Sequence, residues 1–376
     1  MTEYSLETGD SLVIVSSGES EKLIETYELQ SYDYTTGQSI DLTEEAITNA
    51  IVDVTSETKP IIYFINNHSA FPIEAFTTIM TELQNDANEV NTVDLLTTGK
   101  VPEDCSCLVI TTLKEDITEI ERDYIIDYIN KGGKILALCG ETTGTVTLTN
   151  FNQILDLYGI SLEEGTIFEG ETENMLSGYP DIIVEEFENG SLLKDGDNLK
   201  VALVDATPIT LTEDEGKLEE LNVEYERLIT TSDSAFVRKN LNITSTTRTS
   251  QDSEEGTYIA GVLATKTLTT AEDSEESGLT SKLIVYSNSM FTTDMAIPLG
   301  QYQYPFVSFY NNIDIVPNAV LYLNEREDII TIRKNYDTVT FTATQSQENI
   351  VKAIIFITPI VIMVMGIVVW LIRRRI

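Results

Sequence analysis

The sequence is poor in the side chains that hold metal ions and in basic residues. It has one histidine and three cysteines in 376 residues, and two of these, Cys105 and Cys107, are separated by a single residue. This pattern excludes a zinc cluster of recognisable spacing and a disulfide framework. The 23 basic residues stand against 62 acidic ones, a net charge of −39. Binding to nucleic-acid phosphates needs clustered Lys and Arg, so we expect no nucleic-acid partner. Because His and Cys are so few, we also expect no metal, and we predict no cofactor.

Long apolar runs are also scarce, and the one that stands out lies at the C-terminus. Residues 353–372 are 20 positions without a charge, long enough at about 1.5 Å per residue to cross the roughly 30 Å core of a bilayer. We predict a transmembrane helix over 350–372. Trp370 stands where an interfacial aromatic belongs, and Arg373, Arg374 and Arg375 follow it in a basic tail over 373–376. By the positive-inside rule this tail is cytoplasmic.

In that orientation, we expect the residues before the helix to lie outside the cytoplasm. The chain is then a single-pass protein of the cell membrane. The first 20 residues have no basic n-region and no long apolar stretch that would carry them across. We therefore expect this chain to be an N-terminally incomplete version of a longer protein whose first membrane helix or signal segment is absent. The alternative is a tail-anchored protein with a cytoplasmic domain.

The whole chain is 42% hydrophobic, which is enough for a sizeable core in the part before the predicted helix. Residues 1–57 predict a β-containing segment with an amphipathic helix over 43–54. Residues 58–335 predict a parallel-sheet α/β domain, because short apolar runs at 61–65, 107–113, 134–139 and 282–287 alternate with helical patterns. Its region 160–280 predicts only irregular β structure, with the charge runs 252–255 and 272–276 as solvated loops. Residues 336–349 predict a polar linker.

Three segments resemble a family of proteins encoded with transporters. They are YDYTTGQSIDLTEEAITNAIVDVTSETKPIIYFINNHSA (32–70), VPEDCSCLVITTLKEDITEIERDYIIDYINKGGKILAL (101–138) and NNIDIVPNAVLYLNEREDIITIR (311–333). They are similar, in the same order, to segments of the gliding-motility-type, GldG-like auxiliary components of ABC-2-type transport systems. The loop NNHSA replaces that family's usual GHGE loop, which removes two glycines and an acid.

The resemblance implies a flavodoxin-like or glutamine-amidotransferase-like extracytoplasmic domain, also related to intraflagellar-transport-like folds. It implies as partners an ABC-2-type permease and its separate ATPase subunit, besides the lipid bilayer. The predicted function is a non-catalytic, membrane-anchored auxiliary subunit of an exporter, whose outer domain contacts the permease or the cargo. No phosphate-binding loop of a nucleotide hydrolase is present in the sequence.

A cleft is predicted where the parallel strands end, since open α/β sheets bind ligands there. Its loops are 66–70, 140–143 and 287–290, and the candidate residues for a ligand or a partner segment are Asn66, Asn67, His68, Ser69, Cys139, Gly140, Glu141 and Thr142. An empty crevice is the interpretation that the sequence favours, because a fold does not by itself imply a function. The alternative function is a Cys-dependent hydrolase or amidotransferase-like enzyme that uses Cys139 and His68.

Overall fold

The computed structural model divides into two compact units, Met1–Asn335 and Tyr336–Ile376. The residues that the structure describes are 12–33, 38–56, 58–140, 146–188, 191–192, 199–268, 278–299 and 302–326, with Lys352 and Trp370 in the second unit. Within these residues, no helix is long and apolar enough to cross a membrane. The predicted linker and, apart from Lys352 and Trp370, the predicted membrane helix and its three arginines lie outside them. The membrane anchor therefore stays a prediction.

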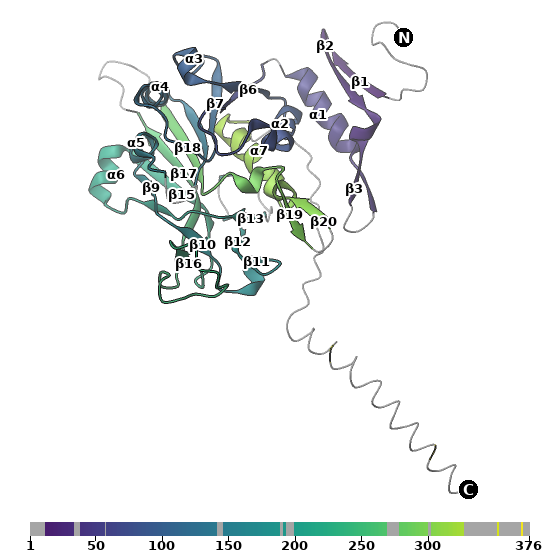
Figure 1. The fold of residues 1–376 in the computed structure, drawn as a ribbon. Helices are drawn as coiled ribbons and strands as arrows, with labels where there is room; N and C mark the ends of the chain where they lie inside the picture. Colours follow the sequence, from purple (N-terminus) through teal and green to yellow (C-terminus); the bar gives the residue numbers. More distant parts are fainter. Residues whose placement is uncertain are drawn as a thin grey trace. The chain divides into compact units, whose positions relative to one another are not determined.

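The N-terminal segment consists of two β-hairpins and a helix (Figure 1). Strands β1 (Leu12–Ser17) and β2 (Ser20–Glu25) pair antiparallel, as do β3 (Gln30–Asp33) and β4 (Gln38–Asp41). Helix α1 (Thr43–Thr55) follows and buries Asn49, Ala50 and Val54, in line with the predicted amphipathic pattern.

The main sheet has nine strands, and five of them are parallel neighbours. In spatial order these are β6 (Glu89–Val93), β5 (Ile61–Ile65), β7 (Cys105–Ile110), β8 (Lys134–Leu138) and β18 (Thr280–Tyr286). Apart from the edge strand β6, each is rich in apolar residues, as strands covered on both faces require. The predicted strands at 61–65, 107–113, 134–139 and 282–287 all contribute to this half of the sheet.

The other half of the main sheet is antiparallel, so the sheet is mixed and not parallel throughout. Strand β17 (Ile259–Thr267) pairs antiparallel with both β18 and β15 (Val223–Thr230). Strand β14 (Ile209–Leu211) continues the sheet to β9 (Ile160–Leu162). Region 160–280, predicted only as irregular β structure, thus supplies four strands of the main sheet. Strands β17 and β18 follow each other along the chain and pair antiparallel, a direction that the strand patterns do not reveal.

Helices cover both faces of the sheet and create two apolar cores. The helices are η2 (Ile73–Phe76) with α2 (Thr77–Asn85), α3 (Leu95–Thr98), α4 (Glu119–Asn130), α5 (Thr149–Asp156), α6 (Glu215–Leu221) and α7 (Asn312–Leu323). Alternate residues of each parallel strand enter different cores. Phe64 packs with residues of α2 and α7, whereas Ile65 packs with residues of α4 and α5. This division follows from the two-residue period of a strand.

Smaller sheets extend the domain. Strands β11 (Met175–Leu176), β12 (Tyr179–Glu186) and β13 (Lys200–Val204) form a three-stranded sheet. Strand β10 (Thr166–Phe168) pairs with β16 (Phe236–Arg238), and β19 (Ala296–Leu299) pairs with β20 (Tyr302–Pro305). The short 3₁₀ turns are η1 (Thr26–Leu29), η3 (Thr172–Asn174), η4 (Met290–Thr292) and η5 (Phe306–Ser308). In the predicted solvated loop 252–255, the Asp252 side chain is instead fully buried against Arg238, while residues 272–276 lie outside the described part.

Two buried carboxyl groups meet where β12 approaches the β15–β16 connection. Glu169 and Glu185 are 0% and 9% exposed, and the Ser232 hydroxyl donates to Glu169 while the Ser232 amide donates to Glu185 Oε1 at 3.1 Å. Burial raises the pKa of Glu185 to about 7; the Ser232 amide opposes that shift, and the neighbouring Glu169 carboxyl adds to it. A carboxylic acid in this position keeps its proton well above the range of an exposed glutamate.

The stability of the domain should fall as pH rises from about 4.5 to 7. The pKa of Glu185 is raised from 4.5 to about 7 in the folded chain, so between these values the folded state holds a proton that the unfolded chain releases. We expect Glu185→Gln to flatten this dependence and to raise the free energy of unfolding at pH 8 by about 2 kcal/mol. Urea unfolding at pH 5 and pH 8 measures both effects. The control is Glu186→Gln, on the exposed next position of β12; equal pH dependence in Glu185→Gln and the wild type would refute the assignment.

Candidate functional site

The carboxyl ends of the parallel strands bring their loops together at one edge of the main sheet. The amide of Ala70 donates to the Thr112 carbonyl at 2.7 Å, and the amide of Lys114 donates to the His68 carbonyl at 2.8 Å. The Thr112 hydroxyl in turn accepts from the Ser289 amide at 3.1 Å. The loop after β7 therefore lies between the predicted loops 66–70 and 287–290 and joins them through hydrogen bonds.

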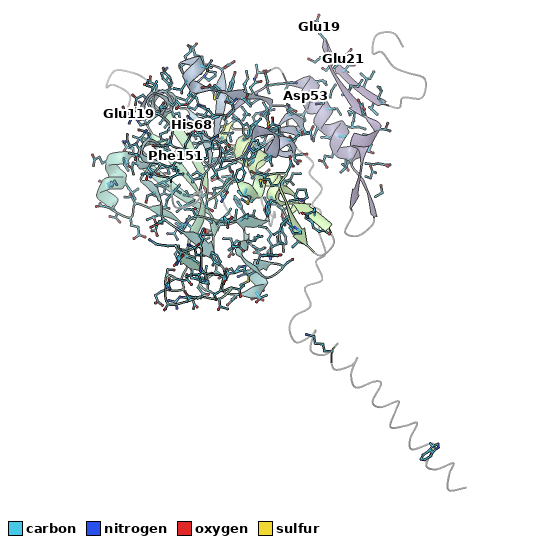
Figure 2. All side chains as sticks on the ribbon, viewed as in Figure 1. Glu19, Glu21, Asp53, His68, Glu119 and Phe151 are labelled. Atoms are coloured by element: carbon cyan, nitrogen blue, oxygen red, sulfur yellow. The ribbon has the colours of Figure 1, made fainter. Side chains whose placement is uncertain are left out.

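At this edge, the buried carboxylate of Glu121 contacts His68, the chain's one histidine. His68 is labelled in Figure 2. His68 Nε2 lies 3.0 Å from Oε2 and 3.1 Å from Oε1 of Glu121. The Asn67 side-chain amide donates to Glu121 Oε1 at 2.7 Å. The Glu121 side chain is 1% exposed and that of His68 is 11% exposed. The result is a largely water-excluded carboxylate–imidazole pair.

Glu121 is placed there by the start of α4. Thr118 is the N-cap of this helix, and its hydroxyl accepts from the Glu121 amide while Glu121 Oε2 accepts from the Thr118 amide at 2.9 Å. This reciprocal capping box fixes the glutamate side chain over the helix N-terminus. Burial alone would raise the pKa of Glu121, but the hydrogen bonds from Thr118 and Asn67 and the charge of His68 together lower it. The group is thus held as a carboxylate.

The His68 backbone is bent to make this contact. Its φ is +65°, in the left-handed region that residues other than glycine rarely adopt. Such a conformation costs on the order of 1 kcal/mol and persists where its surroundings hold it. Here the bond from Lys114 and the bridge between Ser69 and Leu113 hold the turn on both sides of the loop.

Among the described residues of this edge, three polar atoms have no hydrogen-bond partner. They are Asn67 Oδ1, His68 Nδ1 and Ser287 Oγ, each shielded from solvent. A carboxylate can only accept, so His68 donates its Nε2 hydrogen to Glu121. Glu115 Oε1 lies 3.7 Å from Nδ1, beyond hydrogen-bond reach. Buried polar atoms are usually paired, so these three mark the edge as unusual.

The residues after β8 lie in a different environment from His68. Cys139 is 1% exposed in the core on the α4 and α5 side, and burial raises the pKa of its thiol to about 12. At neutral pH it is therefore a thiol and not the nucleophilic thiolate. Gly140 lies against the loop after β18, because a Cβ atom on it would stand 2.4 Å from the Ser287 carbonyl oxygen. Glu141 and Thr142 lie outside the described residues.

Most of the other predicted site residues are used in loop-to-loop contacts. The Asn66 amide donates to the Val93 carbonyl at 3.2 Å, and the Ser69 hydroxyl lies 2.7 Å from that of Thr111. The sequence analysis did not identify Glu121 or Thr112, whereas Ser289 lies in the predicted loop 287–290. For Glu121 a signal was available, since Thr118 followed three positions later by Glu is a capping box, but this pattern indicates a helix start and says nothing about a site. Among the described residues, no group of three or more His, Cys, Asp or Glu side chains is arranged to hold a metal ion.

Comparisons with known proteins place this edge within a transport-related segment. Residues 59–173 match the model of a family described as an ABC-type uncharacterized transport system. The match runs from β5 through η3 and includes His68, Glu121 and Cys139. It supports an auxiliary component of an ABC transport system.

Two further comparisons add no function. No match is found among curated proteins. Among solved structures, the chain is similar to the mmIFT52 N-terminal domain, with 15% sequence identity, a TM-score of 0.48, and coverage of 70% of this chain and 97% of that chain. A TM-score of this size carries no inference about fold or function.

Proposed function

We propose that this protein is a non-catalytic, membrane-anchored auxiliary subunit of an ABC-2-type exporter of the GldG-like kind. Its α/β domain lies outside the cytoplasm and contacts the permease or the cargo, and its C-terminal helix crosses the membrane. The separate ATPase subunit supplies the energy. The observation that carries this proposal is the match of residues 59–173 to the ABC-type transport family.

The chemistry at the carboxyl ends of the parallel strands fits a subunit without an enzymatic role. The Cys139 thiol is buried with its pKa raised to about 12, and His68 is already engaged by Glu121. A cysteine hydrolase needs a thiolate activated by a base within hydrogen-bond reach. The ring nitrogens of His68 face the carboxylates of Glu121 and Glu115. These observations favour the auxiliary subunit over the hydrolase that Cys139 and His68 suggested.

The proposal predicts a stable complex with other transporter subunits. Affinity purification of the tagged full chain from its own membranes, in a neutral detergent, should recover an ABC-type ATPase and a polytopic permease in amounts comparable to the bait. A tag at the extreme C-terminus should be accessible only after the membrane is opened, because the basic tail is expected in the cytoplasm.

A matched control separates a specific complex from detergent carry-over. An unrelated single-pass protein of similar abundance, purified the same way, should recover neither subunit. Recovery of the tagged chain alone, from membranes that contain both subunits, would contradict the proposed assembly. Replacement of both His68 and Cys139 by Ala should leave transport unchanged in a folded protein if the subunit is non-catalytic, and loss of transport would favour the enzyme instead.

A further inference from the structure

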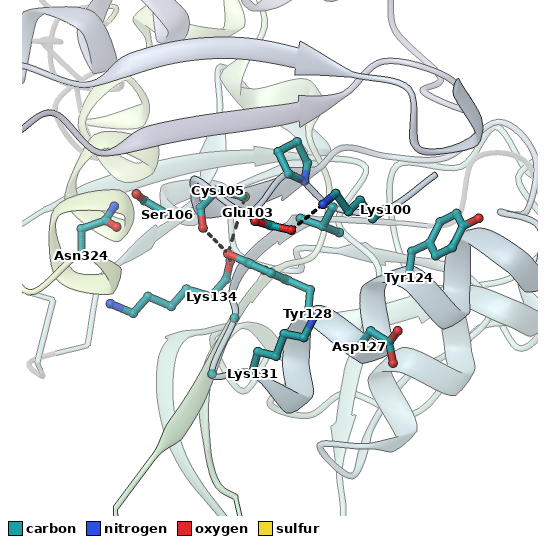
Figure 3. A pocket seen from close by; sticks show the side chains of 14 residues that line it. Lys100, Glu103, Cys105, Ser106, Tyr124, Asp127, Tyr128, Lys131, Lys134 and Asn324 are labelled. Atoms are coloured by element: carbon teal, nitrogen blue, oxygen red, sulfur yellow. Dashed lines mark hydrogen bonds and ion pairs between the residues drawn. The ribbon is translucent and has the colours of Figure 1, made fainter. Parts of the chain in front are cut away.

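A pocket of about 390 Å³ lies at the amino edge of the parallel strands, opposite the edge that carries His68 (Figure 3). It is bounded by the start of β7 at Cys105, the start of β8 at Lys134 and the end of α4. Tyr124 and Tyr128 contribute aromatic wall, and Asn324 closes it from the end of α7. The volume is within the range of sites that take small molecules.

The pocket gathers positive charge in a strongly acidic chain. Three lysines line it, namely Lys100, Lys131 and Lys134, together with two acids, Glu103 and Asp127. Lys100 is paired with Glu103 at 2.5 Å. Within the described residues, the ammonium groups of Lys131 and Lys134 form no ion pair, so the lining carries an excess of one positive charge. At physiological salt the field of acids beyond about 8 Å is screened. The local potential is therefore set by the charges of the lining and by Asp104, whose charge acts on the lining residue Cys105.

The shape of the pocket depends on the turn that separates its two unpaired lysines. Gly132 has a φ of +81°, and a Cβ on Gly133 would stand 2.4 Å from the Tyr128 ring. The glycine pair therefore lets that ring lie flat against the turn. The Tyr128 hydroxyl lies 3.3 and 3.2 Å from the carbonyl oxygens of Cys105 and Lys134, which share its one hydrogen, and this contact holds the ring as a wall of the pocket. Lys131 and Lys134 are thus presented on a defined frame.

We propose that this pocket binds the phosphodiester group of a singly charged ligand, a chemistry shared by lipid headgroups and by soluble glycerophosphodiesters. Lysine acts on phosphate as a point charge, whereas the planar fork of arginine is the better match for a carboxylate, and the lining has no arginine. One excess positive charge balances one negative charge, which favours a diester over a doubly charged phosphate monoester. Pro102 and the rings of Tyr124 and Tyr128 offer carbon surface to the groups esterified to the phosphate. This inference does not depend on the proposed function.

Calorimetry on the full chain in a neutral detergent tests the site. The probes are glycerophosphoglycerol, inorganic phosphate and acetate, and we expect the diester to bind most tightly. The double variant Lys131→Gln with Lys134→Gln should bind the diester at least about tenfold more weakly, since both charged contacts with the phosphate are lost. Lys217→Gln, on the exposed face of α6, is the matched control and should bind as the wild type does.

A second variant keeps the test decisive if the double variant is unstable. Asp127→Asn removes one acid from the lining and should tighten binding of the diester several-fold, a gain that misfolding cannot produce. No binding of the diester by the wild type would overturn the proposal. So would unchanged affinity in a folded double variant, or weaker binding in Asp127→Asn.

The source of the diester is distinguished by membrane composition. The full chain is placed in nanodiscs of a neutral, phosphate-free glycolipid with or without phosphatidylglycerol, and the soluble diester is titrated into both. Reduced diester binding in the phosphatidylglycerol discs assigns the site to a lipid headgroup. Equal binding in both assigns it to a soluble ligand, and either result supports the phosphodiester site.

Discussion

Replacement of Glu121 by alanine should lower the free energy of unfolding by about 3–5 kcal/mol, the cost of removing one partner from a buried charged network. The Glu121 carboxylate accepts from the Thr118 amide and hydroxyl, from Asn67 and from His68. Without it, the Asn67 amide and the His68 ring are left in a shielded site, and α4 loses half of its capping box. Urea unfolding followed by circular dichroism measures the loss.

Two further substitutions show whether the carboxylate itself is responsible. Glu119→Gln, on the exposed first position of the same helix, should change stability by less than about 0.5 kcal/mol. Glu121→Gln keeps the shape and part of the hydrogen bonding, so its cost should be intermediate. A loss in Glu121→Ala no larger than in Glu119→Gln would show that the His68 loop does not depend on the pair.

The sequence predicted the parallel half of the sheet because local patterns are strong there. The apolar run of β5 and the helical periodicity of α4 need no knowledge of distant residues. The antiparallel half was missed because pairing direction is not a local property. Strand β17 is apolar over most of its length, as β18 is, and nothing in either segment tells that the first runs against the second.

The candidate site was also predicted only in part, because some of its residues follow from local patterns and others depend on distant contacts. Asn67 and His68 were found because they follow a buried strand, at the edge where ligands bind. Their partner Glu121 is 53 residues away from His68 and was hidden within a helix-start pattern. Likewise, Asp252 belongs to a run of acids that predicts a solvated loop. Its side chain is instead 0% exposed and pairs with Arg238, whose Nη2 lies 2.8 Å from Asp252 Oδ2. Long-range partners of this kind cannot be read from one segment.

In the loop between β16 and β17, Arg238 is paired with Asp252. The Arg238 side chain is 1% exposed and contacts both carboxylate oxygens of Asp252, through Nε at 2.9 Å and Nη2 at 2.8 Å. It also donates to the carbonyls of Ser245 and Thr247. The guanidinium carbon lies 4.4 Å from the ring centre of Phe168. One planar group thus organises the loop through ionic, hydrogen-bond and stacking contacts.

Arg238→Lys should therefore cost about 3 kcal/mol although it keeps the charge, because an ammonium group cannot replace a bidentate, stacked guanidinium. The matched control is Arg248→Lys in the same loop. Arg248 pairs with Glu254, whose side chain is 93% exposed, and such a pair contributes at most about 1 kcal/mol. Equal losses in the two variants, measured by urea unfolding at pH 7, would contradict the role given to the fork of Arg238.

The contact between Arg238 and Asp252 also determines how the stability of the domain changes with pH below about 4. The hydrogen bond from Arg238 is the main cause that lowers the pKa of Asp252 from 3.8 to about 2. The folded state then releases a proton that the unfolded chain still holds, so this stabilisation is complete above about pH 4 and is lost as pH falls toward 2. Glu185 acts in the opposite sense between about pH 4.5 and 7. Together the two groups favour greatest stability near pH 4 to 5, and Arg238→Lys should weaken the acid limb while leaving the Glu185 limb unchanged.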